Sequence, residues 1–412
     1  MIDRVDKHLA GWKTKCLSLA GRVTLIQATI TAIPAYLMQS ARLPRSLCDE
    51  LDMKVRKFLW GGTAMQRKPH LVAWNVVTKE KAQGGLGIRS MWHLNSALLM
   101  KLGWRLHAEP SALWVRILKE KYGRGRDLTD LIGRRISCSN AWRGILEHIQ
   151  LSNQGLCVAI GDGRQAQFWQ HKWLDGERLL EQASGVVPET HRHKKVSEYW
   201  KLDVGWEWTQ FSSLLLASTL QRIASYELLS DEVGDRVIWA ADNSGKFTIK
   251  SAVKLLRPTD SHTETDRKWM WKIRISQRIK LFLWLVLHLK ILSNAERFKR
   301  QMISSPQCDL CLGELEDLEH ILRSCPKARE VWQELRIEGL RYIAGEEEFS
   351  KWIRQNLQRT HDDPDWSTKF MITLWYIWKW RCSYSFNADE ENPREKGKLL
   401  LNKFRETLHV LQ

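Results

Sequence analysis

The segment CDLCLGELEDLEHILRSC, residues 308–325, gathers three cysteines and one histidine at spacings that suit a metal ion. Cys308 and Cys311 form a Cys-x2-Cys pair, and His320 and Cys325 follow after eight and four intervening residues. Such a turn lets two thiolates face one ion, and the returning segment supplies an imidazole and a third thiolate. Four protein ligands complete a zinc tetrahedron and leave no position for water or substrate. The pattern therefore predicts one structural Zn²⁺ held by Cys308, Cys311, His320 and Cys325.

A simpler interpretation of the same residues is that unrelated thiols bracket a helical histidine. The five other cysteines form no comparable cluster, which favours the metal. Pro326 suits the first turn of a helix over residues 326–335, so Cys325 is expected near its N-cap, where the helix dipole favours a thiolate.

The cysteine usage fits a reducing compartment better than a disulfide framework. The N-terminus MIDRVDKHLAGWK has charged residues where a signal peptide requires an apolar core. The most apolar stretch, residues 279–292, is interrupted by Lys280, His288 and Lys290, so no membrane span is expected. These features predict an intracellular protein, nuclear or cytoplasmic, with no membrane partner.

The positive charge is concentrated in the first third of the chain. Residues 1–126 hold 22 Lys and Arg against 8 Asp and Glu, whereas residues 127–266 hold 16 against 19 and residues 267–412 hold 26 against 20. The basic residues are interleaved with Trp and Gly, so nucleic acid is the expected partner ahead of a membrane surface. The alternative is an ordinary basic surface with no specific partner.

Helices are expected over most of the chain. Apolar periodicity predicts two helices within residues 5–41 with a break at 18–21, and further helices at 47–60, 91–107 and 112–122. Gly84-Gly85-Leu86-Gly87 lacks the lysine and hydroxyl that follow in a phosphate-binding loop, and we expect an ordinary turn there. Trp375, Trp378 and Arg381 share one face of a late helix, where burial is expected in preference to base stacking.

Two hairpins are expected in the middle third, one from residues 156–160 and 165–169 and one from 237–241 and 246–249. The fold class predicted is therefore mainly α, with a small antiparallel β-hairpin region and a small zinc-binding module, in several domains.

The sequence also carries a family resemblance. The runs LAGWKTKCLSLAGRVTLIQATITAIPAYLMQSARLP, KFLWGG and KEKAQGGLGIRSM resemble the region after the catalytic palm in reverse transcriptases of plant non-LTR (long interspersed) retrotransposons. IGDG and SGKFTIKSA resemble linker segments of the same polyproteins. Residues from about 268 to 332 are similar to the reverse-transcriptase zinc-binding domain, and all four expected zinc ligands match it.

This resemblance implies four regions. They are a helical thumb-like and connection region at 1–126, a linker region with two β-hairpins and helices at 127–262, the zinc-binding domain at 263–340, and C-terminal helices at 341–412. In the family the thumb lies against the primer-template duplex. Basic residues at the first helix break, in the following loop and beside the metal are therefore candidate contacts to RNA or DNA: Lys13, Lys15, Arg22, Arg67, Lys68, Arg278, Lys280, Lys299 and Arg300. The alternative for each is a solvated helix face.

The family's reaction, RNA-templated DNA synthesis, needs carboxylates that hold two metal ions, largely from a Tyr-x-Asp-Asp segment. The Asp362-Asp363 pair lies between RTH and Pro364 and is expected to be an interhelical loop, so it is assigned no catalytic role. We therefore expect a catalytically incomplete, reverse-transcriptase-derived chain that binds nucleic acid. The palm or ribonuclease-H-like portions of a longer polyprotein are further expected partners. The alternative is a protein-interaction or scaffold module in which zinc is purely structural.

Overall fold

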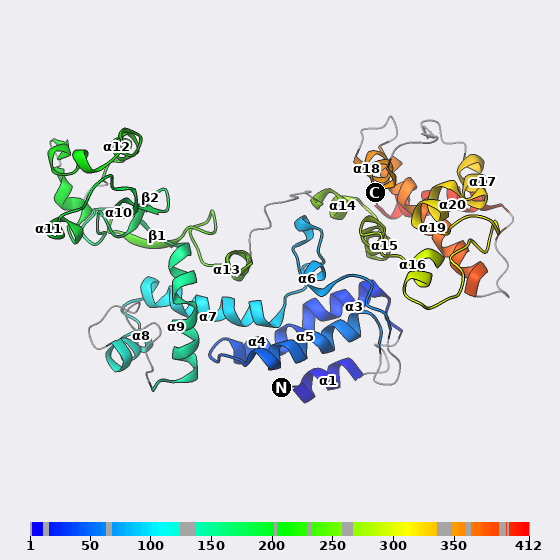
Figure 1. Cartoon of the computed structure of the whole chain (residues 1–412), viewed down its shortest axis with the longest axis horizontal. Helices are drawn as coiled ribbons and strands as arrows, with labels where there is room; N and C mark the ends of the chain where they lie inside the picture. The colour runs from blue at the N-terminus through cyan, green and yellow to red at the C-terminus, as the bar shows by residue number, and fades with distance from the viewer. Residues whose placement is uncertain are drawn as a thin grey trace. The chain divides into compact units, whose positions relative to one another are not determined.

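The computed structural model describes residues 2–10, 16–62, 68–123, 137–201, 204–228, 233–257, 267–335, 348–358, 364–386, 393 and 395–411. Helices dominate these residues, and short antiparallel strands make up the rest of the regular structure (Figure 1). This confirms the expected mainly α fold. A helix with the length and apolar character needed to cross a membrane does not occur in the described part of the chain.

Helix α5, Arg45–Leu59, forms where apolar periodicity predicts it. Leu51, Val55 and Leu59 are four residues apart, so they share one face, and all three are fully buried. The helix ends at Gly61, whose φ of 73° lies in the left-handed region that glycine adopts without a steric penalty. The space beside Gly61 is filled by Arg22, since a Cβ there would lie 2.1 Å from a guanidinium nitrogen.

The described residues group into two compact units, each assembled from segments that are distant in the sequence. Unit 1 contains Met1–Thr31, Asp52–Arg89 and Ser261–Gln412, and unit 2 contains Ala32–Leu51 and Ser90–Asp260. The elements of unit 1, besides the second half of α5, are α1 (Ile2–Ala10), α3 (Leu19–Leu25), the π-helical turn η1 (Ile26–Ile30), α6 (Trp74–Val77), the 3₁₀ turn η2 (Lys81–Gln83), α14 (Lys268–Lys272), α15 (Gln277–Leu287), α16 (Asn294–Lys299), the π-helical turn η8 (His320–Ser324), α17 (Pro326–Glu334), α18 (Phe349–Gln358), α19 (Trp366–Phe386) and α20 (Lys396–Leu411).

In unit 1 the beginning of the chain shares a core with its last third. Helix α15 packs against both α3 and α19. The fully buried Trp284 of α15 donates its indole N–H to the carbonyl of Gly84 at 2.8 Å. Gln27 donates its amide to the carbonyl of Leu86, also at 2.8 Å. The glycine-rich turn at residues 84–87 is therefore a junction inside unit 1.

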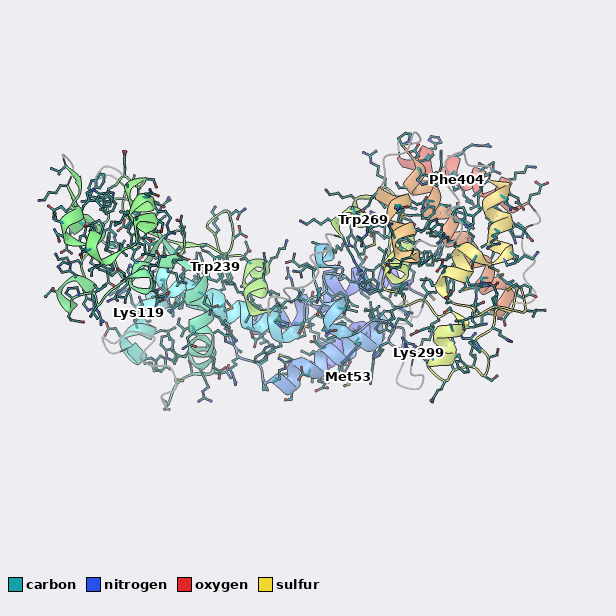
Figure 2. The ribbon with its side chains drawn as sticks, turned by 45° about the horizontal axis from the view of Figure 1, so that its top comes forward. Met53, Lys119, Trp239, Trp269, Lys299 and Phe404 are labelled. Carbon is teal, nitrogen blue, oxygen red and sulfur yellow. The ribbon has the colours of Figure 1, made fainter. Side chains whose placement is uncertain are left out.

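Unit 2 is built on helix α7, which packs against α4, α9 and α13. Its elements, besides the first half of α5, are α4 (Ala32–Met38), α7 (Met91–Ala108), α8 (Leu113–Leu118), the π-helical turn η3 (Lys119–Gly123), α9 (Asn140–Gly155), β1 (Leu156–Ala159), β2 (Lys172–Leu174), β3 (Glu177–Arg178), α10 (Leu179–Gln182), α11 (Glu189–Arg192), η5 (Val196–Tyr199), β4 (Trp200–Lys201), β5 (Gly205–Trp206), η6 (Trp208–Gln210), η7 (Ser212–Leu214), α12 (Ala217–Ala224), β6 (Arg236–Trp239) and α13 (Ile249–Leu256). Trp239, labelled in Figure 2, fills the space beside Gly155 and donates its indole N–H to Ser251 at 2.8 Å.

The two hairpins predicted from the sequence do not form. Strand β1 pairs antiparallel with β6, so each predicted hairpin contributes one strand to a shared ladder that runs from Leu156–Trp239 to Ala159–Arg236. The cause is Asp235, whose carboxylate accepts hydrogen bonds from the backbone N–H groups of four residues at 2.8–2.9 Å: Gly161, Gly163, Gln165 and Ala166. These bonds fold the IGDG segment into a loop around one carboxylate and end strand β1.

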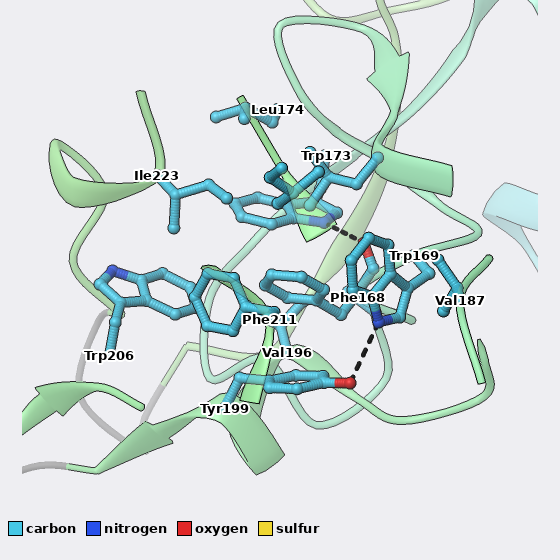
Figure 3. Close-up of a cluster of buried hydrophobic side chains, with 13 residues drawn as sticks. Phe168, Trp169, Trp173, Leu174, Val187, Val196, Tyr199, Trp206, Phe211 and Ile223 are labelled. Atoms are coloured by element: carbon cyan, nitrogen blue, oxygen red, sulfur yellow. Dashed lines mark hydrogen bonds between the residues drawn. The ribbon is translucent and has the colours of Figure 1, made fainter. Parts of the chain in front are cut away.

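An aromatic cluster forms the core beyond this loop (Figure 3). The ring of Phe168 lies within 4.4–6.1 Å, centroid to centroid, of the rings of Trp169, Trp173, Tyr199, Trp206 and Phe211. Trp169 donates its indole N–H to the Tyr199 hydroxyl at 3.0 Å, which satisfies a polar group that burial would otherwise leave unpaired. Here the tryptophans are core residues.

Candidate metal centre

The four predicted zinc ligands converge on one point of unit 1. Ligand atoms of Cys308, Cys311, His320 and Cys325 all lie within 4.8 Å of one another, and three of these side chains are buried. Bonds of about 2.3 Å to sulfur and 2.0–2.1 Å to nitrogen place tetrahedral ligands roughly 3.5–4 Å apart. Cys311 Sγ and His320 Nε2 are 3.3 Å apart and the most distant pair is within 4.8 Å, so all four atoms can reach one ion with small shifts. The residues therefore fit a zinc ion.

The first two ligands sit on a tight turn. The backbone N–H groups of Cys311 and Leu310 point at the sulfur of Cys308 and favour its thiolate form. The turn closes through the N–H of Leu312, which donates to the carbonyl of Cys308 at 2.9 Å. Leu312 adopts φ of 58°, a left-handed conformation that is unusual for a leucine, and its side chain is exposed.

The other two ligands come from η8 and the start of α17. Cys325 is the N-cap residue of α17 and Pro326 occupies its first turn, as the sequence predicts. Without a metal, the pKa of Cys325 is lowered by a hydrogen bond from Cys308 and by the N–H groups of Lys327 and Ala328. Hydrogen bonding to Cys325 raises the pKa of Cys308 to about 12. The ligands thus share protons that a bound cation would displace.

A glutamate orients the histidine ligand. Nε2 of His320 faces Cys311, whereas Nδ1 lies 2.8 Å from a carboxylate oxygen of Glu314. A proton on Nδ1 donated to this carboxylate leaves the lone pair of Nε2 directed at the metal position. The pKa of His320 is raised to about 9, first by its hydrogen bond to Cys308. Sequence reasoning did not single out Glu314 as a neighbour of the histidine ligand, because acidic residues crowd this loop.

Comparison with known proteins gives this geometry a family context. Residues 247–332 match the family described as zinc-binding in reverse transcriptase, and this range contains all four ligands. The chain is 34% identical over 400 residues to a putative ribonuclease H protein of Arabidopsis thaliana, an alignment that covers 94% of this chain and 64% of that protein. It is also 34% identical over 151 residues to an uncharacterized mitochondrial protein of Arabidopsis thaliana, covering 36% of this chain and 97% of the relative.

The chain belongs to the reverse-transcriptase-related retroelement proteins. It spans less than two thirds of the length of its ribonuclease H relative. No solved structure matches it. The Cys3His cluster of this retroelement protein holds one structural zinc, because protein ligands fill every position of the tetrahedron.

The segment that carries the zinc ligands of this retroelement protein also takes part in a buried ionic network. Arg381 of α19 is paired with Glu316 of the metal loop, by which we mean residues 308–325, and the two side chains are 1% and 0% exposed. Arg381 also donates to Oδ1 of Asn294 at 2.8 Å, and the backbone N–H of Asn294 donates to Glu316 at 2.8 Å. The network therefore connects the metal loop to α16 and α19. The expected burial of Arg381 is confirmed, and Phe282 of α15 contacts the rings of Trp375 and Trp378.

The candidate nucleic-acid contacts lie in different environments. Lys13, Lys15 and Arg67 are outside the described residues, as is the Asp362-Asp363 pair. Lys68, Arg278 and Lys299 are exposed, and no carboxylate among the described residues lies within ion-pair distance of them. Lys299 is labelled in Figure 2.

The remaining candidates are more enclosed. Arg22 packs against Gly61, and burial lowers its pKa. Arg300 pairs with Glu296 at 2.7 Å and donates to the carbonyl of His70 at 3.2 Å. Lys280 is 8% exposed and donates to the carbonyl of Trp271 at 2.8 Å.

Proposed function

We propose that this chain is a nucleic-acid-binding protein derived from a plant non-LTR reverse transcriptase. In this proposal a structural zinc stabilises the fold of the helices that carry the basic surface. The chain corresponds to the thumb-like region and zinc-binding domain of the parent enzyme, which form the enzyme's C-terminal portion. The nucleic acid is RNA or DNA, and contacts fall mainly on phosphates, since the relevant side chains are Lys and Arg.

The observation that carries this proposal is the set of unpaired cations beside the zinc module. Arg278 and Lys299 are exposed on α15 and α16, the helices that lead into the metal loop, and the described residues offer neither one a carboxylate partner. An excess of 14 positive charges over residues 1–126 adds a field of the same sign. A surface of this kind attracts a polyanion and binds it in a salt-dependent way.

We further propose that this chain lacks polymerase chemistry. Nucleotidyl transfer needs carboxylates that hold two metal ions. Among the described residues, the one group of three or more metal-capable side chains is the Cys3His cluster, whose thiolates suit zinc and not magnesium. This supports a binding role for the chain, with catalysis left to other parts of a polyprotein.

Fluorescence anisotropy with a labelled RNA–DNA hybrid, across a salt series, tests the binding proposal. We expect binding at low ionic strength that weakens linearly on a log–log plot as salt rises. Zinc-loaded protein that fails to bind at low ionic strength would exclude the proposal and favour a scaffold module. Primer extension with the same protein is expected to yield no product, and an extended primer would contradict the absence of polymerase chemistry.

A further inference from the structure

A second group of cations in unit 1 lies near the glycine-rich turn at residues 84–87. We call it the basic cluster and define it as Lys81, Arg267, Lys280, His288 and Arg354. These residues come from η2, the segment before α14, α15, the end of α15 and α18. Helix α14 packs against η2, and the N–H of Arg267 donates to the carbonyl of Ala82 at 2.9 Å. Residues more than 180 positions apart are therefore fixed beside one another.

Arg267 and His288 meet at the carbonyl of Gly84. His288 Nε2 lies 2.8 Å from this oxygen and Arg267 Nη1 lies 3.1 Å from the same Nε2. When Nε2 of His288 carries a proton and donates it to the carbonyl, it has no lone pair left to accept a hydrogen bond from Arg267. The guanidinium of Arg267 then faces a second donor. Gly84 has φ of 83°, and a Cβ there would lie 3.1 Å from the Arg267 side chain. Glycine thus lets the guanidinium lie flat on the turn.

Lys280 and Lys81 meet at Trp271. The ammonium group of Lys280 donates to the carbonyl of Trp271 at 2.8 Å, and that of Lys81 lies 4.9 Å from the centre of the Trp271 ring. Burial and the charge of Lys81 both lower the pKa of Lys280. Burial and the charge of Arg354 lower the pKa of Arg267 in the same way. The cations are close enough to repel one another.

Nothing in the described part of the chain neutralises this cluster. No described carboxylate lies within 4.0 Å of Lys81, Arg267, Lys280 or Arg354, although Lys280 is almost fully buried. Enclosed charges normally occur with a partner, because an unpaired charge loses its hydration without compensation. The hydrogen-bond partners of Arg267, Lys280 and His288 are neutral ring and carbonyl groups, so the arrangement suits an external anion.

We propose that the basic cluster binds a phosphate group of a polynucleotide backbone. This rests on the proposed nucleic-acid function and places it at a defined site. A phosphate oxygen can accept hydrogen bonds from Arg267, whose planar fork matches phosphate geometry, while the exposed cations Lys81 and Arg354 add positive charge. The buried ammonium group of Lys280 adds to the positive field. Three of these cations, Lys81, Arg267 and Arg354, are absent from the contacts that the sequence predicts.

The first test uses tripolyphosphate as a probe with zinc-loaded full-length protein. The site variant is K81Q/R267Q/R354Q, and the control K379Q/K398Q/R405Q removes the same charge from exposed positions of α19 and α20. We expect tripolyphosphate to raise the Tm of the wild type and the control in a concentration-dependent way, with little effect on the site variant. Equal stabilisation of all three proteins would overturn the proposal. The double variant K81Q/R354Q, which changes only exposed residues, repeats the test if the triple variant folds poorly.

The second test measures binding of an RNA–DNA hybrid to the same proteins across a salt series. Loss of this phosphate contact should make the slope of log affinity against log salt less negative by about one in the site variant, and leave the control nearer the wild type. Equal slopes for variant and control would contradict a polynucleotide source. If the wild type binds no hybrid, the proposed function fails, and the tripolyphosphate result then decides whether the cluster takes free phosphate instead.

Discussion

Arg381 of α19 and Glu316 of the metal loop form an ion pair that is buried from water. They are separated by 65 residues and belong to α19 and the metal loop. The partners are Nε and Nη2 of the guanidinium and both carboxylate oxygens, which is the two-point geometry that favours Arg over Lys. The metal loop is thus anchored on one side by zinc and on the other by this pair.

Replacing Arg381 with Met should lower the free energy of unfolding by about 3–5 kcal/mol, because it leaves the carboxylate of Glu316 buried without a partner. Urea denaturation of the zinc-loaded protein measures this. The double variant E316Q/R381M should recover part of the loss, since it removes the stranded charge. A loss of less than about 1 kcal/mol in R381M would show that water reaches the pair.

Replacing Glu314 with Gln should weaken zinc binding about tenfold, because the Nδ1 proton of His320 loses its carboxylate acceptor. Competition with a chromophoric chelator measures the affinity. Glu406 of α20 pairs with Lys403 far along the chain, so Glu406→Gln is a control that removes the same charge. Equal zinc affinities for the two variants would rule out an orienting role for Glu314.

Asp235 should make unit 2 sensitive to acid. Burial alone would raise its pKa, but the N–H groups of Gly161, Ala166, Gln165 and Gly163 outweigh burial and hold the pKa below its ordinary value. A carboxyl with a depressed native pKa stabilises the fold above its unfolded pKa, and this stability is lost as pH falls through the native pKa. We therefore expect protection of these four amides against hydrogen exchange to fall at pH values below about 4.

The variant Asp235→Asn should show reduced amide protection already at neutral pH, by about 2 kcal/mol, and a flatter dependence on pH. Asp175→Asn removes an exposed carboxylate of the same unit and serves as the control. Identical protection profiles for D235N and wild type would show that the four hydrogen bonds contribute nothing to loop stability.

Leu312 is strained, so Leu312→Gly should stabilise the zinc-loaded protein. A left-handed conformation costs a leucine roughly 1–2 kcal/mol, while glycine adopts it freely but loses more entropy on folding. The net gain expected is about 0.5–1 kcal/mol, measured by denaturation. The side chain is exposed, so little packing is lost. Destabilisation by L312G would mean that Leu312 has an apolar partner in solution.

The zinc ligands could be predicted because their spacing is a local property. Two thiols two residues apart can face one ion whatever the rest of the fold does, and Cys325 at the N-cap of α17 follows from Pro326. Helix α5 was equally predictable, since its apolar period and its terminal glycine both lie in one stretch of sequence.

The features that could not be predicted all depend on partners distant in the sequence. The hairpin interpretation of IGDG was wrong because a carboxylate more than 60 residues away, that of Asp235, organises the turn. The burial of Glu316 could not be predicted, because its partner Arg381 belongs to α19. The glycine-rich turn did not reveal the basic cluster, because Arg267 and Arg354 come from parts of the chain distant in the sequence.

Metal analysis of purified protein tests the central claim that Cys308, Cys311, His320 and Cys325 hold one structural zinc. We predict one zinc per chain in the wild type, little zinc in Cys308→Ser, and a loss of hydrogen-exchange protection over residues 308–334 in that variant. Cys382→Ser, which changes a cysteine outside the cluster, should keep its zinc. A full equivalent of zinc and unchanged protection in C308S would contradict the assignment.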